Sequence, residues 1–394
     1  MNPFDITLLR KDTPGCEHVL HFNNAGSSLP PKPVIDAVKH HLDLEATRGG
    51  YEAAKLASKT IQEFYKHASS LINCNRDEIA FLDNATRAWD MAFYSLQFKS
   101  GDKILTTVCE YASNYLAFLH RAKKTGVVID VIKNDETGQL DVHDLKSKID
   151  ERVKLIAITH VPTQGGLINP ARDIGKIAKQ FNIPYLLDAT QSIGQMPIDV
   201  RELSCDFLCA TGRKYLRGPR GTGFLYISQE MIKDCDPPFV DLHAATWTKD
   251  NEYILRDDAL RFETWEQNIA AKIGLSKAIQ YALKISIPTI WERIQQLAAQ
   301  LRQQLLEMGC VELHDLGLHK CGIITFSSKN KLPEEIQHYL ATKMINVSVS
   351  LQEYARLDMA KRNLPALVRA SVHYYNTESE IDHLCAEIKR FLKG

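Results

Sequence analysis

Polar or aromatic side chains stand at or within a few residues of the ends of five short apolar runs of this sequence. They are Thr86, Tyr111, Thr163, Asp188 and Lys214. A lysine in such a place can form a Schiff base with a carbonyl cofactor, and a carboxylate can pair with a protonated pyridine nitrogen. The small-residue turn at 84–86 opens a predicted helix and offers N–H groups to a phosphate, while the ring of Tyr111 could lie against a planar heterocycle. Singly, each signal is weak, because an Asp after a strand is often a helix cap and a Lys in a glycine-rich loop is usually solvated.

The apolar runs themselves have the length and composition of buried strands. The run before Thr86 lies at 80–82, and the other strand-like runs of this part of the chain lie at 104–108, 127–132, 155–159, 185–187, 207–210 and 223–227. Amphipathic stretches such as 172–181 separate several of them. Strands and helices in alternation predict an α/β fold with a mostly parallel sheet and helices on both of its faces. Ligands of such sheets bind beyond the carboxyl ends of the strands, so we expect the five side chains around one crevice.

The pattern changes at about residue 268. The predicted elements are helices at 270–283, 288–308, 333–344 and 378–392, with strands near 322–326 and 370–372. This succession predicts a smaller α+β domain. We therefore expect a large domain at 22–267 and a small C-terminal domain at 268–394, with residues 1–21 packed against the small one.

Composition is that of an ordinary globular protein, with 44% hydrophobic residues and 48 Lys+Arg against 48 Asp+Glu. A formal net charge of zero gives no indication of a nucleic acid or an anionic membrane as partner. No apolar run approaches the roughly 20 residues of a membrane helix, and the N-terminus lacks the pattern of a secretory signal. Nine scattered cysteines without a CxxC pair predict free thiols in the cytoplasm. The histidines are not at metal-ligand spacing, so no metal site is expected.

Two stretches resemble the class V aminotransferase family, a branch of the fold type I pyridoxal-phosphate enzymes. They are Leu187-Asp188-Ala189-Thr190-Gln191-Ser192 and Ala210-Thr211-Gly212-Arg213-Lys214, the second followed by Gly218-Pro219-Arg220-Gly221-Thr222-Gly223. The branch contains cysteine desulfurases and isopenicillin N epimerases, and the resemblance extends from 22–26 to 369–377. It implies the fold type I architecture, pyridoxal 5′-phosphate as cofactor, an α-amino acid as substrate and a homodimer with a shared active site.

The resemblance also implies a role for each matching residue. Lys214 would carry the cofactor and move protons at Cα, and Asp188 would keep the pyridine nitrogen protonated. The other cofactor contacts would be Gln191 and Thr163 at the ring hydroxyl, Ala85, Thr86 and Thr211 at the phosphate with Arg213 in reach, and Tyr111 on the ring face. Arg369 matches the arginine that clamps the substrate α-carboxylate. Asn24 and Arg48 would meet the distal part of the substrate. The alternative is that Asn24 is an ordinary loop residue and that Arg48 and Arg213 have only surface roles.

The sequence departs from the family at two places. In much of the family a Gly-Thr pair from the second subunit touches the phosphate, whereas Trp265 and Glu266 stand there in this chain and are the candidates to cross over. Desulfurases carry a nucleophilic Cys on a loop shortly before the substrate arginine, and the corresponding stretch 346–354 has none. A persulfide mechanism through a mobile thiolate is therefore not expected.

The resemblance implies that a carbanion forms at Cα of the substrate, but it says less about the reaction step that follows. The Trp-Glu variant, the missing Cys and the segment 48–54 resemble the cystine-lyase and sulfoxide-lyase subgroup, including hercynylcysteine sulfoxide lyases. We therefore expect C–S β-elimination from a cysteine S-conjugate or sulfoxide, with release of pyruvate and ammonia. An amino-acid epimerase or an aminotransferase is the alternative. A non-catalytic binding protein is disfavoured, because Lys214, Asp188 and Arg369 are all present.

Overall fold

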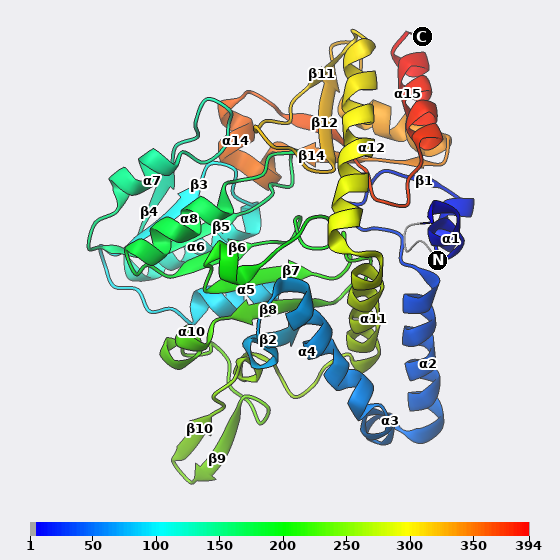
Figure 1. Cartoon of the computed structure of the whole chain (residues 1–394). Helices are drawn as coiled ribbons and strands as arrows, with labels where there is room; N and C mark the ends of the chain where they lie inside the picture. The colour runs from blue at the N-terminus through cyan, green and yellow to red at the C-terminus, as the bar shows by residue number, and fades with distance from the viewer. Residues whose placement is uncertain (1–4, 394) are drawn as a thin grey trace.

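A seven-stranded sheet forms the centre of the computed structural model, which describes residues 5–393 (Figure 1). Its strands lie in the order β2 (Ile79–Leu82), β8 (Gly223–Ile227), β7 (Phe207–Thr211), β6 (Tyr185–Asp188), β5 (Val153–Thr159), β3 (Lys103–Thr107) and β4 (Val128–Ile132). Neighbours from β7 to β4 pair in parallel, and β8, antiparallel to both β2 and β7, runs opposite to the other strands of this sheet. The mostly parallel sheet predicted from the sequence is confirmed.

Helices cover both faces of this sheet, which is why its inner strands are apolar without alternation. Side chains on one face, among them Leu155 and Leu186, pack with helices α5 (Ala85–Tyr94) and α6 (Ala112–Thr125). Side chains on the other face, such as Ile156, pack with α7 (Val142–Lys148) and α8 (Ala171–Gln180). The two faces therefore bury separate hydrophobic clusters.

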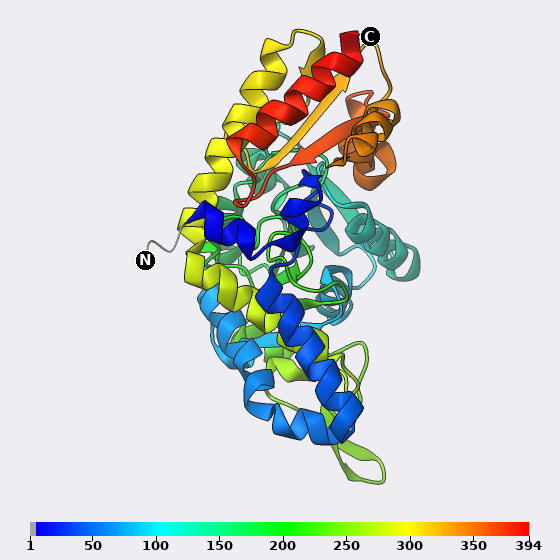
Figure 2. The ribbon, with the colours of Figure 1, turned by 90° about the vertical axis from the view of Figure 1, so that its right-hand side faces the viewer.

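A second sheet of four antiparallel strands lies at the far end of the molecule (Figures 1 and 2). Its order is β11 (Val311–Leu313), β12 (Ile323–Ser328), β15 (Ala366–Ser371) and β14 (Ser348–Leu351), and its helices are α12 (Ile287–Glu307), α13 (Pro333–Thr342), α14 (Arg356–Lys361) and α15 (Glu378–Lys393). Figure 2 shows α12 and α15 side by side on one face of this sheet. These elements form the smaller α+β unit.

The segment that contains β1, within the described residues 5–21, lies beside this smaller unit. After α1 (Ile6–Lys11), strand β1 (Leu20–His21) pairs in parallel with β13 (Ile345–Asn346). Helix α11 (Ile269–Ile285), however, packs against α2 (Lys32–Arg48) and α4 (Ser58–Ile72) of the large unit. This packing favours a domain boundary where α11 meets α12 over the one expected after residue 267. Residues 1–4 and 394 of the expected domains lie outside the described part.

The remaining elements lie at the periphery of the large unit. They are α3 (Gly50–Leu56), α9 (Val200–Leu203), α10 (Gln229–Asp234), β9 (Ala245–Lys249) and β10 (Glu252–Leu255). Strands β9 and β10 form a hairpin that projects from the body (Figure 1), and Trp247 and Tyr253 on it are exposed. Across residues 5–393, no helix is long and apolar enough to span a membrane.

Candidate active site

A cavity of about 200 Å³ opens at the carboxyl ends of the parallel strands. It is lined by Asn84, Ala85, Thr86, Tyr111, Asn114, Thr159, Val161, Thr163, Asp188, Thr190, Gln191, Arg213 and Lys214. The residues selected from the sequence that line it are Ala85, Thr86, Tyr111, Thr163, Asp188, Gln191, Arg213 and Lys214. The crevice expected from the strand ends therefore exists, and it gathers side chains from segments far apart in the chain.

Lys214 follows β7 and is buried, with only 8% of its surface exposed. Its Nζ has no hydrogen bond or ion pair with any residue between 5 and 393 that the structure describes. Burial lowers the pKa of this amine well below its ordinary value, and the guanidinium groups of Arg213 and Arg369 act in the same direction. A neutral, unpaired amine is the form of lysine that attacks a carbonyl group.

The backbone before and after Lys214 is shaped by close packing. A Cβ at Gly212 would lie 2.1 Å from Oγ1 of Thr222, so only glycine fits there. On the other side, the buried guanidinium of Arg217 donates from Nε to the carbonyl oxygen of Leu29 at 2.7 Å and from Nη2 to Oγ1 of Thr13 at 2.6 Å. The turn that presents Lys214 is thus tied to the N-terminal segment.

Asp188 ends β6, and both of its carboxylate oxygens are held. Oδ1 accepts a hydrogen bond from the N–H of Thr190 at 2.9 Å, and Oδ2 accepts one from Nδ2 of Asn114 at 2.9 Å. The same Asn114 nitrogen donates to Oε1 of the buried Glu110 at 2.8 Å. The orientation of the Asp188 carboxylate is therefore fixed before any ligand binds.

Several of these residues were missed in the sequence. Besides Glu110, which lies behind the wall, they are Asn84, Asn114, Thr159, Val161 and Thr190. A usable signal existed for Asn114, because it lies in the first turn of the helix α6, which directly follows Tyr111. Thr159 is the last residue of β5, so it also obeyed the strand-end rule.

The N-terminus of α5 forms one end of the cavity. Asn84 is the N-cap, and its side chain accepts from the N–H of Arg87 at 2.9 Å. The N–H groups of Ala85 and Thr86 thus begin the helix at the cavity wall, where the helix dipole favours an anion. Arg213 lies in the same wall, which places it in the site and not at a surface position.

Thr211 does not line this cavity. Its hydroxyl donates to the carbonyl oxygen of Thr222 at 3.2 Å and accepts from Nη1 of Arg213 at 3.1 Å. Thr211 is thus absent from the described lining of the cavity, and its hydroxyl bonds to the strand pair and to Arg213, so the phosphate contact expected for it stays a prediction.

The small unit reaches the cavity through Arg369 on β15. Nη1 of Arg369 donates to the carbonyl oxygen and to Oγ1 of Thr163, at 3.1 and 2.7 Å, and Nε donates to Oγ of Ser348 at 3.1 Å. Burial lowers the pKa of Arg369 to about 10, so the group stays charged at neutral pH. Arg369 itself lies just behind the lining, at the edge that Thr163 forms.

Asn24 and Arg48 lie elsewhere. Asn24 is fully buried, and its Nδ2 donates to the carbonyl oxygens of His21 and Ser371 at 3.2 and 2.7 Å, while its Oδ1 accepts from the hydroxyl of Tyr375. Because every polar atom of this amide is used within the fold, the expected substrate contact is corrected to a structural role. Arg48 is exposed at the end of α2 and does not line the cavity of its own chain.

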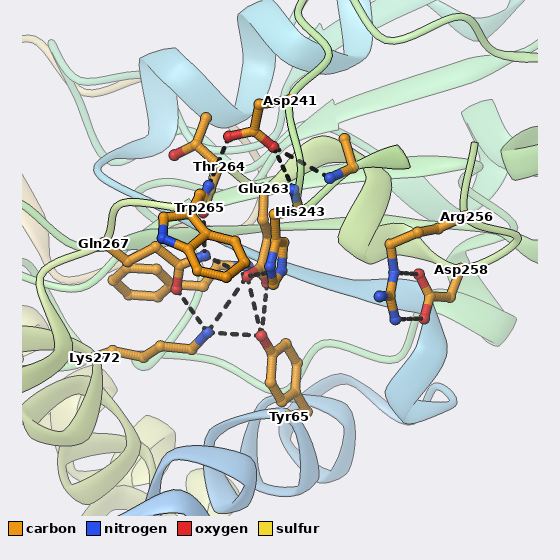
Figure 3. Close-up of polar contacts among 12 residues, drawn as sticks. Tyr65, Asp241, His243, Arg256, Asp258, Glu263, Thr264, Trp265, Gln267 and Lys272 are labelled. Atoms are coloured by element: carbon orange, nitrogen blue, oxygen red, sulfur yellow. Dashed lines mark hydrogen bonds and ion pairs between the residues drawn. The ribbon is translucent and has the colours of Figure 1, made fainter. Parts of the chain in front are cut away.

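Trp265 and Glu266 follow a buried polar cluster, shown in Figure 3. The carboxylate of Glu263 accepts from the N–H of Phe81 at 2.6 Å and the hydroxyl of Tyr65 at 2.8 Å, and it lies 3.4 Å from Nζ of Lys272. Asp241 accepts from the N–H of Trp265 at 2.7 Å. Trp265 is thus fixed at its backbone while 59% of its surface remains exposed.

The family described as aminotransferase class-V matches residues 20–384. The chain belongs to this family. The class-V chain is 33% identical to a protein named as a probable cysteine desulfurase of Pyrococcus abyssi, over 98% of its own length and 97% of that protein. It is 32% identical to a probable cysteine desulfurase of Borreliella burgdorferi, over 98% and 96% of the two chains.

Solved structures agree with this membership. The apo structure of a cysteine desulfurase from Thermococcus onnurineus NA1 superposes with a TM-score of 0.92 at 31% identity, over 98% of both chains. The cystine C–S lyase C-DES, solved with its product cysteine persulfide, gives 0.87 at 22% identity over 96% and 99% of the chains, a likeness in fold alone. The fold type I architecture and pyridoxal 5′-phosphate as the cofactor of this class-V chain, both predicted from the sequence, are confirmed.

The cavity fits this cofactor. It contains an unpaired buried amine, a fixed carboxylate and a helix N-terminus, which match the aldehyde, pyridine nitrogen and phosphate of pyridoxal 5′-phosphate. Two polar atoms of its wall, Oγ1 of Thr190 and Oε1 of Gln191, are buried and have no partner among the described residues. Buried polar atoms are rarely left unpaired, so these two indicate a polar ligand.

Proposed function

We propose that this class-V protein cleaves the Cβ–S bond of a cysteine S-conjugate or sulfoxide. The observation that carries the proposal is the unpaired, buried amine of Lys214 in one cavity with the fixed carboxylate of Asp188. The names of the relatives, cysteine desulfurases, support a sulfur-containing amino acid as substrate. When bound, pyridoxal 5′-phosphate supplies an electron sink for the negative charge that develops at Cα.

Residues of the cavity hold this cofactor at three points. Asp188 pairs with the pyridine nitrogen and keeps it protonated. The N–H groups of Ala85 and Thr86, together with Arg213, bind the phosphate. The contacts to the rest of the ring come from Tyr111 on its face and from Gln191 and Thr163 at its hydroxyl.

Arg369 binds the α-carboxylate of the substrate with its planar fork, at the cavity edge that Thr163 forms. This contact orients Cα toward Lys214, whose Nζ removes the Cα proton. The electron pair of the Cβ–S bond then leaves with the sulfur, which takes up a proton. The remaining enamine reacts with one water molecule and gives pyruvate and ammonia.

The positions of the cysteines support release of the sulfur in a product over its transfer to the enzyme. No cysteine lines the cavity, and the segment 346–354, which has no cysteine, contains strand β14. Cys109, Cys209 and Cys321 are all buried, and burial raises the pKa of each thiol, that of Cys321 to about 11. A neutral buried thiol is a poor sulfur acceptor.

Product analysis distinguishes the proposal from its alternatives. The holoenzyme is incubated with L-cystine, an S-alkyl-L-cysteine sulfoxide and L-cysteine, and pyruvate, ammonia, alanine and D-amino acids are measured. Pyruvate and ammonia in equal amounts are expected from the first two substrates. Alanine from L-cysteine would instead identify a desulfurase, the function that the names of the relatives favour. D-amino acid would identify an epimerase, and keto acid without ammonia an aminotransferase.

The proposal includes a homodimer in which Trp265 and Glu266 approach the site of the second subunit. The support is that Trp265 is exposed although its backbone is anchored by Asp241 and follows the buried Glu263. Arg48, exposed at the end of α2, would reach the partner in the same way. Size-exclusion chromatography with light scattering tests the assembly, and a Trp265→Ala variant that loses cofactor would support the crossing.

A further inference from the structure

Glu110 is a buried carboxyl that lies directly behind the cavity wall. It follows β3 and precedes the cavity residue Tyr111, and only 4% of its surface is exposed. The side chain does not line the cavity, and the roles proposed above make no use of it. Burying a carboxylate without a partner of opposite charge costs folding free energy, which indicates that this side chain has a role in the fold or in the site.

Every contact of the Glu110 carboxylate is with a donor. Oε2 accepts from Oγ1 of Thr106 and from the N–H of Thr159, both at 3.1 Å. Oε1 accepts from the N–H of Tyr111 at 3.1 Å, from Nδ2 of Asn114 at 2.8 Å and from Oγ1 of Thr159. The donors come from the ends of β3 and β5 and from the start of α6, so one carboxylate joins β3 to two elements, β5 and α6, that line the cavity.

Asn114 connects this carboxylate to Asp188. Its Nδ2 carries two hydrogens, of which one points to Oε1 of Glu110 at 2.8 Å and the other to Oδ2 of Asp188 at 2.9 Å. With both hydrogens committed, the amide cannot rotate without breaking one of the two bonds. The orientation of Asp188 thus depends on an acceptor that lies outside the cavity.

We propose that Glu110 is a positioning residue for the pyridine end of the cofactor, acting through Asn114 on Asp188. This role rests on the proposed pairing of Asp188 with the pyridine nitrogen. A carboxylate at Glu110 orients the Asn114 amide so that its second hydrogen reaches Asp188, and it holds Thr159 and Tyr111 in the same wall. Preorganised polar groups of this kind avoid the cost of reorientation when the ligand binds.

The experiment is a double-mutant cycle on the full-length protein, stripped of cofactor and titrated with pyridoxal 5′-phosphate. Glu110→Gln keeps the size of the side chain but replaces an acceptor oxygen by a donor. It is expected to weaken cofactor binding about tenfold, the effect of losing one charge-assisted hydrogen bond, and to shift the visible absorption band of the bound cofactor. Asn114→Ala should weaken binding by a similar factor, and the double variant should bind no more weakly than Asn114→Ala.

Glu78→Gln is the matched control. Glu78 is also buried and accepts from the N–H of Asn75 at 2.7 Å, but it precedes β2, forms an ion pair with Arg201 and does not line the cavity. This variant should lower Tm and leave the cofactor dissociation constant unchanged. If Glu110→Gln behaves in the same way, or if its effect adds fully to that of Asn114→Ala, the positioning role is wrong.

Two further variants keep the proposal testable. Should Glu110→Gln fail to fold, Thr106→Val removes one donor to Glu110 from outside the cavity, and a weakening of cofactor binding by about threefold is expected. Unchanged binding in Thr106→Val would then overturn the role. Asp188→Asn reports on the proposed function separately: if it leaves cofactor affinity and absorption unchanged, the assignment of Asp188 fails, whatever Glu110 does.

Discussion

Oγ1 of Thr163 accepts a hydrogen bond from Nη1 of Arg369 at 2.7 Å, and this bond joins the two sheets of the molecule at the edge of the cavity. Thr163 follows β5 of the seven-stranded sheet, and Arg369 lies on β15 of the four-stranded sheet. A substrate carboxylate that binds Arg369 would compete with Thr163 for the same guanidinium. With the proposed role of Arg369, substrate binding and the contact between the two units would therefore be coupled at this residue.

Replacing Arg369 with Ala should raise KM for the amino acid by about 10- to 100-fold, because two charge-assisted hydrogen bonds to the carboxylate are lost. The cofactor should stay bound, which its visible absorption reports. Arg369→Lys, which keeps the charge without the fork, should recover only part of the loss. Loss of cofactor in Arg369→Ala would show that the arginine lies at the wrong end of the site.

Lys214→Ala should abolish turnover and the covalent attachment of the cofactor. The reason is that Lys214 supplies the only unpaired amine in the lining of the cavity as the structure describes it. Reduction with borohydride followed by peptide mass spectrometry locates the modified lysine in the parent protein. Measurable turnover in Lys214→Ala would refute the assignment.

Lys272→Met should destabilise the protein by roughly 3–5 kcal/mol, because Glu263 would keep a buried charge without its partner. Burial opposes that charge, but Lys272 and the hydrogen bonds outweigh it and hold the pKa of Glu263 below its usual value. Adding Glu263→Gln to Lys272→Met should restore part of the stability. Urea unfolding of the single and double variants measures the effect, and equal stability of Lys272→Met and the parent would contradict it.

Glu110 should make the stability of the cofactor-free protein fall as pH rises. Burial raises the pKa of this carboxyl to about 7, above the value of about 4.3 in an unfolded chain. The folded state therefore holds a proton more tightly, and the stability present below pH 4 is lost between about pH 4 and pH 7. Between pH 5 and pH 8 the parent should lose about 3 kcal/mol relative to Glu110→Gln.

The thiols of Cys109 and Cys209, which lie near Glu110, do not contribute to this loss of stability with rising pH. Burial raises the pKa of both thiols well above the range in which Glu110 titrates. Asp188, the other carboxylate nearby, is present in both proteins, and so are the remaining groups. Urea unfolding at both pH values gives the difference between them. A constant difference between parent and variant across the window would contradict the prediction.

Cys109→Ser and Cys321→Ser should leave the rate of pyruvate formation within about twofold of the parent. Both thiols are buried outside the cavity lining, so neither can reach a substrate sulfur without a rearrangement. Steady-state assays with L-cystine check this. Loss of activity together with loss of a protein-bound persulfide in either variant would restore the desulfurase mechanism.

The place of Lys214 and Asp188 at the cavity could be predicted from the sequence, because each ends or follows an apolar run and the ends of parallel strands converge. The sequence was insufficient for Glu110 and Asn114, whose partners lie on other strands. It misassigned Asn24 for the same physical reason. The amide of Asn24 bonds to Ser371, and nothing local in the sequence reveals a contact over such a separation.

The expected domain boundary shows a related limit. The change of pattern near residue 268 is real, since α11 begins at Ile269. Periodicity identifies a helix and its apolar face, but it does not say which neighbour that face meets. Helix α11 meets α2 and α4 of the large unit, so the first helix after the change belongs to the preceding unit.

The pairing of β1 with β13 has a consequence for biosynthesis. Leu20 and His21 leave the ribosome long before the residues they pair with, Ile345 and Asn346, are translated. Strand β1 must therefore stay without its partner strand while the large sheet forms. Its pairing with β13 is among the last events of folding. A nascent chain halted before residue 345 should expose this strand to proteases, and a chain released after it should not.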